Sequence, residues 1–102
     1  MAIMDEQEEL RLKLNRETAR LAWSELERHF AAGAVIAVSD DLDLIEVAAR
    51  IANDDTAPVS QWMAENRLGK VSDAQASAWQ AADAVLWAVV VKPWVLVQMR
   101  AS

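Results

Sequence analysis

The sequence of 102 residues contains no cysteine and no tyrosine, and it has only two glycines, two prolines and one histidine. Without cysteine the chain cannot form a disulfide, a thiolate nucleophile or a thiolate metal site. Two isolated glycines exclude a glycine-rich phosphate-binding loop, and the glycine-flanked serine motif of many hydrolases is also absent. These absences remove many common catalytic groups, so we expect a protein without a cofactor and without catalytic activity.

The sequence also lacks a hydrophobic run long enough to cross a membrane. Its most apolar stretch, residues 84–97, is interrupted by Lys92 and Pro93, whereas a spanning helix needs about 20 apolar residues. The first residues are followed directly by acidic ones, and the basic start and long apolar run of a secretory signal are missing. We therefore expect a cytoplasmic protein without membrane contact.

Positive charge is scarce as well, because 10 lysines and arginines stand against 16 aspartates and glutamates, for a net charge of −6. A protein that binds nucleic acid needs a basic face to contact phosphates, so we expect no nucleic-acid partner. Hydrophobic residues make up 54% of the chain, which is enough to bury a core in a chain of single-domain length.

Hydrophobic periodicity predicts an α+β domain in which four to five helices pack on a small sheet of two to three strands. A charged N-terminal helical extension, residues 1–15, precedes a single domain, residues 16–102. The strands are expected at about 34–38, 85–91 and 94–99. The helices are expected at about 4–20, 23–32, 42–53, 56–68 and 73–83.

Short polar motifs mark the ends of these helices. Gly33 stands where a C-terminal cap is expected, and Ser72 with Gln75 matches a capping box. Asp40 or Asp41 is predicted to cap the third helix. In the fourth helix Val59, Trp62 and Met63 are expected to face inward, and Gly69 is expected to end it.

The C-terminal segment contains Lys92-Pro93 between two apolar runs. Proline cannot adopt the positive φ that a type I′ hairpin turn requires. The segment is therefore either one strand kinked at Pro93 or two strands joined by another turn. Considered as one strand, it places Trp94 on a face that becomes polar toward Gln98, which is typical of a half-exposed interaction site.

An acidic cluster occupies residues 40–55, where six acids stand against the single base Arg50. The spacing does not match a calcium-binding loop, because Glu46 occupies the position that requires glycine. We expect these acids to cap helices and to form a solvated face. Asp40, Asp41 and Asp43 could also contact a basic partner, and divalent-metal binding is a weaker alternative.

His29 is the only histidine, and it falls near the expected end of the second helix. It could act as a general base with Ser24, Glu25 or a nearby aspartate. A histidine at such a place is more often packed, or favoured there by the helix dipole. A small enzyme or ligand-binding domain that uses His29 and nearby carboxylates is therefore the alternative interpretation.

Several strings together resemble a small bacterial family of uncharacterised proteins, domain of unknown function 2288. The strings that carry the resemblance are Glu17–Arg20, Trp23–Leu26, Val35–Ile36, Leu42–Ala48, Trp62, Leu86–Val91 and Pro93–Gln98. The resemblance covers about residues 16–98, and it implies a small bacterial protein without an assigned activity.

The sequence favours a non-enzymatic module that binds another protein or forms a homodimer. Five tryptophans, an apolar C-terminal strand that would invite pairing at a sheet edge and the acidic cluster support this interpretation. The predicted interaction surface consists of Asp40, Asp41, Asp43, Trp94 and Gln98.

Overall fold

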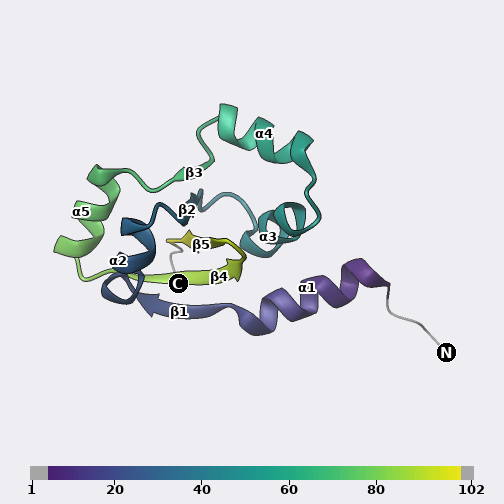
Figure 1. Ribbon diagram of the computed structural model, residues 1–102, viewed down its shortest axis with the longest axis horizontal. Helices are drawn as coiled ribbons and strands as arrows, with labels where there is room; N and C mark the ends of the chain where they lie inside the picture. Colours follow the sequence, from purple (N-terminus) through teal and green to yellow (C-terminus); the bar gives the residue numbers. More distant parts are fainter. Residues whose placement is uncertain (1–4, 100–102) are drawn as a thin grey trace.

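The computed structural model describes residues 5–99, which form five helices around one five-stranded sheet (Figure 1). The α+β class expected from the sequence is confirmed. The elements in chain order are α1 (Glu6–Glu17), β1 (Ala19–Ala22), α2 (Trp23–Ala31), β2 (Val35–Val38), α3 (Leu44–Ala52), α4 (Thr56–Ala64), β3 (Leu68–Lys70), α5 (Asp73–Ala81), β4 (Val85–Val91) and β5 (Trp94–Gln98).

The strands lie in the order β1-β4-β5-β2-β3. Only β2 and β5 run parallel, and the other three neighbouring pairs are antiparallel. The carboxyl ends of β2 and β5 therefore meet at one end of the sheet. The two edge strands are β1, with four residues, and β3, with three.

Each face of the sheet has its own core. One core packs α1 and α3 against Val89 and Leu96 of the central strands. The other packs α2 and α5 against Leu86 and Val97, and there the Trp23 ring packs at an angle against the rings of Phe30 and Trp79. Side chains alternate between the faces of a strand, so the nearly continuous apolar run of β4 supplies both cores.

Local polar contacts fix several helix ends as predicted. The Ser72 hydroxyl accepts a hydrogen bond from the Gln75 N–H, and the Gln75 side chain accepts one from the Ser72 N–H, both at 3.1 Å. Gly33 follows α2 with φ +74°, a conformation that glycine adopts without steric cost. The third helix differs from the prediction: Asp43, rather than Asp40 or Asp41, is its N-cap, because its carboxylate accepts from the N–H of Ile45 and Glu46.

The sheet is larger than the predicted two to three strands because β1 and β3 were not foreseen. Residues 19–20 were expected to continue the first helix, but Thr18 ends it and β1 pairs with β4. The fourth helix ends at Ala64 rather than at Gly69, which lies in β3. Neither strand is rich in β-branched residues, so their extended conformation depends on pairing with a neighbouring strand.

Pro93 separates two strands rather than kinking one. Lys92 and Pro93 form the turn of the β4–β5 hairpin, with a cis peptide bond between them. Trp94 and Gln98 consequently lie on the same face as Val89, the face that α1 and α3 cover. The face assignment of a single continuous strand is thus wrong.

The structure also bears on the expected absence of membrane contact. Among residues 5–99, no helix combines the length and the hydrophobicity that crossing a lipid bilayer requires.

Candidate functional site

The structure separates the residues of the predicted interaction surface. Asp40, Asp41 and Asp43 lie in the loop after β2, whereas Trp94 begins β5 at the opposite end of the sheet. Trp94 and Gln98 are about 13 Å apart along the strand, at about 3.3 Å per residue. No single surface brings these five residues together.

Gln98 is not a surface residue, because only 1% of it is exposed. Its side-chain amide donates hydrogen bonds to the backbone oxygens of Ser39, at 2.8 Å, and Leu42, at 2.6 Å. Its own oxygen, Oε1, is buried without a partner among the described residues. Gln98 therefore fastens the loop after β2 to the end of β5 instead of meeting a partner.

The acidic loop is occupied by contacts within the chain. Ser39 and Arg67 both donate to the Asp41 carboxylate and hold its pKa below the usual aspartate value. Asp43 caps α3 through its carboxylate. Asp40 is exposed at the tip of the loop.

Two further acids of the cluster, Glu46 and Asp55, pair with arginines on the outside of α3. Arg11 of α1 donates to Glu46 and lowers the pKa of that carboxyl, and Arg50 donates to Glu46 and Asp55, both at 2.8 Å. Residues 5–99 contain no group of three or more histidine, cysteine, aspartate or glutamate side chains placed to hold a metal ion. The weaker alternative of a metal site therefore has no ligand set in the described part of the chain.

His29 lies half-buried in the last turn of α2. The nearby Glu25 carboxylate is engaged at the other end of this helix, where it accepts a hydrogen bond from the Ala22 N–H at 3.0 Å. Ser24 is exposed in the first turn. The residues proposed for the enzymatic alternative thus do not converge on a common cleft.

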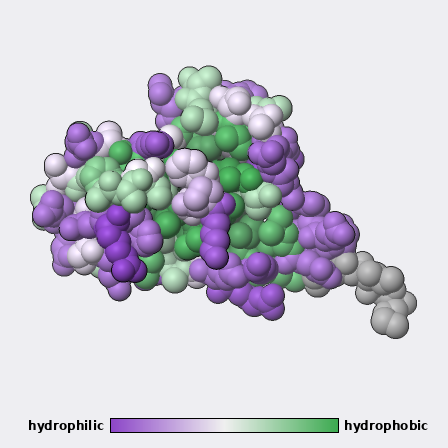
Figure 2. Space-filling model, in the orientation of Figure 1, coloured by the Kyte–Doolittle hydropathy of each residue, from purple (hydrophilic) through white to green (hydrophobic). Residues whose placement is uncertain are grey.

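An apolar groove of about 200 Å³ lies between α3, α4 and the β3 side of the sheet. Figure 2 shows hydrophobic side chains gathered below α4, framed by hydrophilic ones. Six hydrophobic residues line the groove: Ile36, Ile51, Val59, Met63, Leu68 and Trp94. Met63 was expected to face inward, but 54% of it is exposed, because α4 projects past the sheet edge and leaves this side of the helix uncovered.

Lys70 is the charged residue that lines this groove. Its ammonium lies 5.7 Å from the centroid of the Trp94 ring, an arrangement that favours the cation electrostatically. None of the ion pairs found in residues 5–99 includes Lys70. Of the five residues of the predicted interaction surface, Trp94 alone lines this groove, where it is half-buried.

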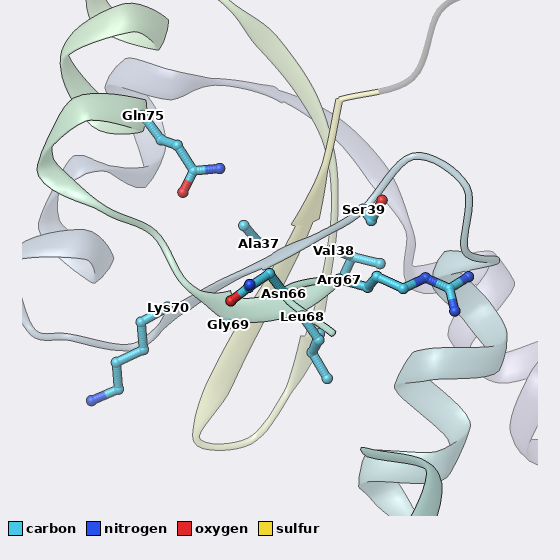
Figure 3. A pocket seen from close by; sticks show the side chains of 9 residues that line it. All are labelled: Ala37, Val38, Ser39, Asn66, Arg67, Leu68, Gly69, Lys70 and Gln75. Carbon is cyan, nitrogen blue, oxygen red and sulfur yellow. The ribbon is translucent and has the colours of Figure 1, made fainter. Parts of the chain in front are cut away.

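A second hollow, of about 390 Å³, shares the three residues of β3 with this groove and is also lined by Ala37 of β2 and Gln75 of α5. Its polar side chains include Asn66, Arg67 and Gln75 (Figure 3). Gln75 reaches toward the strands from α5, while Lys70 and Arg67 diverge to opposite sides. The edge strand β3 therefore borders both an apolar groove and a polar hollow.

The matches to known proteins agree with this fold. The family model described as a protein of unknown function, DUF2288, matches residues 9–99. The NMR solution structure of PA1075 from Pseudomonas aeruginosa is similar with a TM-score of 0.81 and 44% sequence identity, covering 100% of this chain and 95% of the other. No curated protein matches the chain. The family match begins within α1, before the boundary at residue 16 expected from the resemblance.

Proposed function

The chain belongs to the DUF2288 family, to which no activity is assigned. From its surface we propose that it is a non-enzymatic protein-binding module. The observation that carries this proposal is the apolar groove beside β3, with Met63 largely exposed and Trp94 half-buried. Exposed large hydrophobic residues around a tryptophan are typical of protein interfaces. The partner is another protein or a second copy of this chain.

The remaining features of the chain support the same class of partner. The net charge of −6 disfavours a nucleic-acid ligand. The acids of residues 40–55 are largely engaged by Arg11, Arg50 and Arg67 or by helix capping, which leaves the groove as the better binding surface. We place this function in the cytoplasm, in keeping with the absence of cysteine.

Site-specific photocrosslinking tests the proposal. A photoreactive amino acid is placed at position 63, and in a control variant at position 77, which is exposed on α5. The captured protein is purified, and its affinity for the wild-type chain is measured by titration calorimetry. Light scattering over a dilution series shows whether the captured protein is a second copy.

We expect capture from position 63 and not from position 77. Met63→Asp should weaken binding of the captured protein at least tenfold, because it places a charge in an apolar contact, and Ser77→Asp should leave it unchanged. Both residues are exposed, so both variants should fold, as circular dichroism would show. Equal capture from the two positions, or binding insensitive to Met63→Asp, would refute a protein-binding groove.

A further inference from the structure

The outer edge of β3 presents unpaired backbone groups. The Ser39 N–H donates to the Arg67 oxygen and the Val71 N–H to the Val35 oxygen. Hydrogen-bonded pairs alternate along an antiparallel ladder, so Gly69 bonds Ala37 across it. The N–H and C=O groups of Leu68 and Lys70 therefore point away from the sheet. No hydrogen bond to these groups is formed within the described residues.

The opposite edge of the sheet, strand β1, leaves fewer backbone groups free. The Trp23 N–H donates to the Ala84 oxygen, so the same alternation leaves Arg20 and Ala22 pointing outward from β1. The Ala22 N–H is already taken by the Glu25 carboxylate. Arg20 on β1 and Lys70 on β3 both place a charged side chain on an edge, so charge does not distinguish the two edges. The difference lies in the Glu25 carboxylate at β1 and in the apolar groove beside β3, which make β3 the better acceptor of another strand.

Side chains of an added strand would alternate between the two hollows beside β3. Those opposite Leu68 and Lys70 would enter the apolar groove, because these two residues pair with Val38 and Ile36 and share their face of the sheet, on which the groove lies. The residue between them would lie opposite Gly69 and face the polar hollow. A Cβ atom placed on Gly69 would meet nothing within 4 Å, so the strand itself leaves room there.

Charge specifies one of the two groove positions. The residue opposite Leu68 would lie among Val59, Met63 and other apolar side chains, which favour a large hydrophobic group. The residue opposite Lys70 would meet an ammonium group that forms no ion pair within the described residues. An opposite charge directly across a strand pair stabilises the pair, whereas a like charge destabilises it.

We propose that β3 receives an extended peptide segment of a partner protein as a sixth strand, with a large hydrophobic residue and a carboxylate two positions apart. This inference rests on the protein-binding function proposed above and names the ligand of the groove. The backbone groups of Leu68 and Lys70 supply affinity, and the groove selects the side chains, as in other cases of strand addition. A second copy is disfavoured because each copy carries a net charge of −6.

The probe for this proposal is a synthetic nine-residue peptide that alternates threonine with valine, glutamate, leucine and valine, so that antiparallel pairing places glutamate opposite Lys70 and leucine opposite Leu68. It is titrated to millimolar concentration into the full-length chain labelled with ¹⁵N. Two control peptides differ by lysine in place of glutamate, or by N-methylation at leucine and glutamate. Two protein variants, Lys70→Glu and the exposed control Lys13→Glu, are titrated in the same way.

We expect saturable shifts of the Leu68, Gly69 and Lys70 amide signals, and slower hydrogen exchange of the Leu68 and Lys70 amides. The lysine peptide should bind about two- to fivefold more weakly, the range that one cross-strand charge pair gives. Lys70→Glu should reverse this preference, and Lys13→Glu should keep it. N-methylation should abolish binding, because it removes the donors that face β3.

Three results would overturn strand addition: unchanged β3 amides, equal binding of the N-methylated peptide, or an unreversed charge preference in Lys70→Glu. A dimer in light scattering, together with slowed exchange of the Leu68 and Lys70 amides without peptide, would replace the peptide by a second copy. A partner captured at position 63 that needs Met63 but leaves the β3 amides unchanged would refute only this inference. If Met63→Asp does not weaken partner binding, the proposed function fails independently.

Discussion

Gln98 offers the sharpest test of the structure, because replacing it by glutamate changes two donors into a carboxylate without changing the shape of the side chain. The amide of Gln98 now donates to the backbone oxygens of Ser39 and Leu42. In Gln98→Glu an ionised carboxylate would face those two oxygens in a site that is 1% exposed. Burial and the facing oxygens both disfavour the charged form, so the pKa of the new carboxyl should be raised.

The sign of the pH dependence follows from that direction. A carboxyl whose folded pKa is raised stabilises the fold fully below its unfolded pKa, about 4.3, and the stability is lost as pH rises toward the folded pKa. The loss is about 1.4 kcal/mol per pH unit over that interval. Between pH 4.5 and pH 7, Gln98→Glu should therefore lose up to about 3 kcal/mol relative to the wild type, the full loss corresponding to a folded carboxyl that stays protonated throughout this range.

Urea unfolding followed by tryptophan fluorescence measures this difference, since the chain has five tryptophans. Gln98→Met serves as the matched control, because it removes the same donors without adding a titratable group. Its deficit relative to the wild type should be the same at both pH values. An equal deficit of Gln98→Glu at pH 4.5 and pH 7 would show that the side chain reaches solvent, and would refute the burial argument.

Three further predictions test packing, backbone and charge. Leu96→Ala should cost about 2–5 kcal/mol in urea unfolding, because this fully buried residue lies at the centre of one core. Asp83→Gly should stabilise the fold by about 0.5–1 kcal/mol, since Asp83 has φ +50° after α5, whereas Ser77→Gly within that helix should destabilise it by a similar amount. Arg11 lowers the pKa of Glu46 in the folded chain. The ionised carboxylate therefore stabilises the fold above the unfolded pKa, and this stabilisation is lost as pH falls through the folded pKa. On acidification from neutral pH to pH 3, the free energy of unfolding of Glu46→Gln should therefore fall by about 0.5–1 kcal/mol less than that of the wild type.

Elements with strong local signals were predicted correctly from the sequence. The capping box of Ser72 and Gln75 and the glycine at position 33 fixed helix ends through contacts within one turn. The apolar runs of β4 and β5 were recognised because β-branched residues dominate them. These features depend on neighbours in the chain, which a sequence displays directly.

The missed features depend on residues far away in the sequence. β3 is extended because Gly69 pairs with Ala37, and nothing within residues 68–70 demands that conformation. Gln98 was expected at a half-exposed surface, but the hairpin turn at Pro93 moved it to a covered face. Met63 was expected in the core, but α4 lies beyond the edge strand β3, where no element covers this side of the helix among the described residues (Figure 1).

The two sheet edges connect these observations to the proposed function. An edge strand with free backbone groups is an aggregation risk that proteins usually reduce with charge, short length or a covering element. β1 follows this rule through Arg20 and the Glu25 carboxylate. β3 is short and bears Lys70, yet the groove beside it stays apolar and its outward backbone groups remain unpaired within the described residues. A three-residue edge is too short to hold a strand by backbone bonds alone, so side chains entering the groove must supply the rest of the affinity and, with it, the selectivity for one partner.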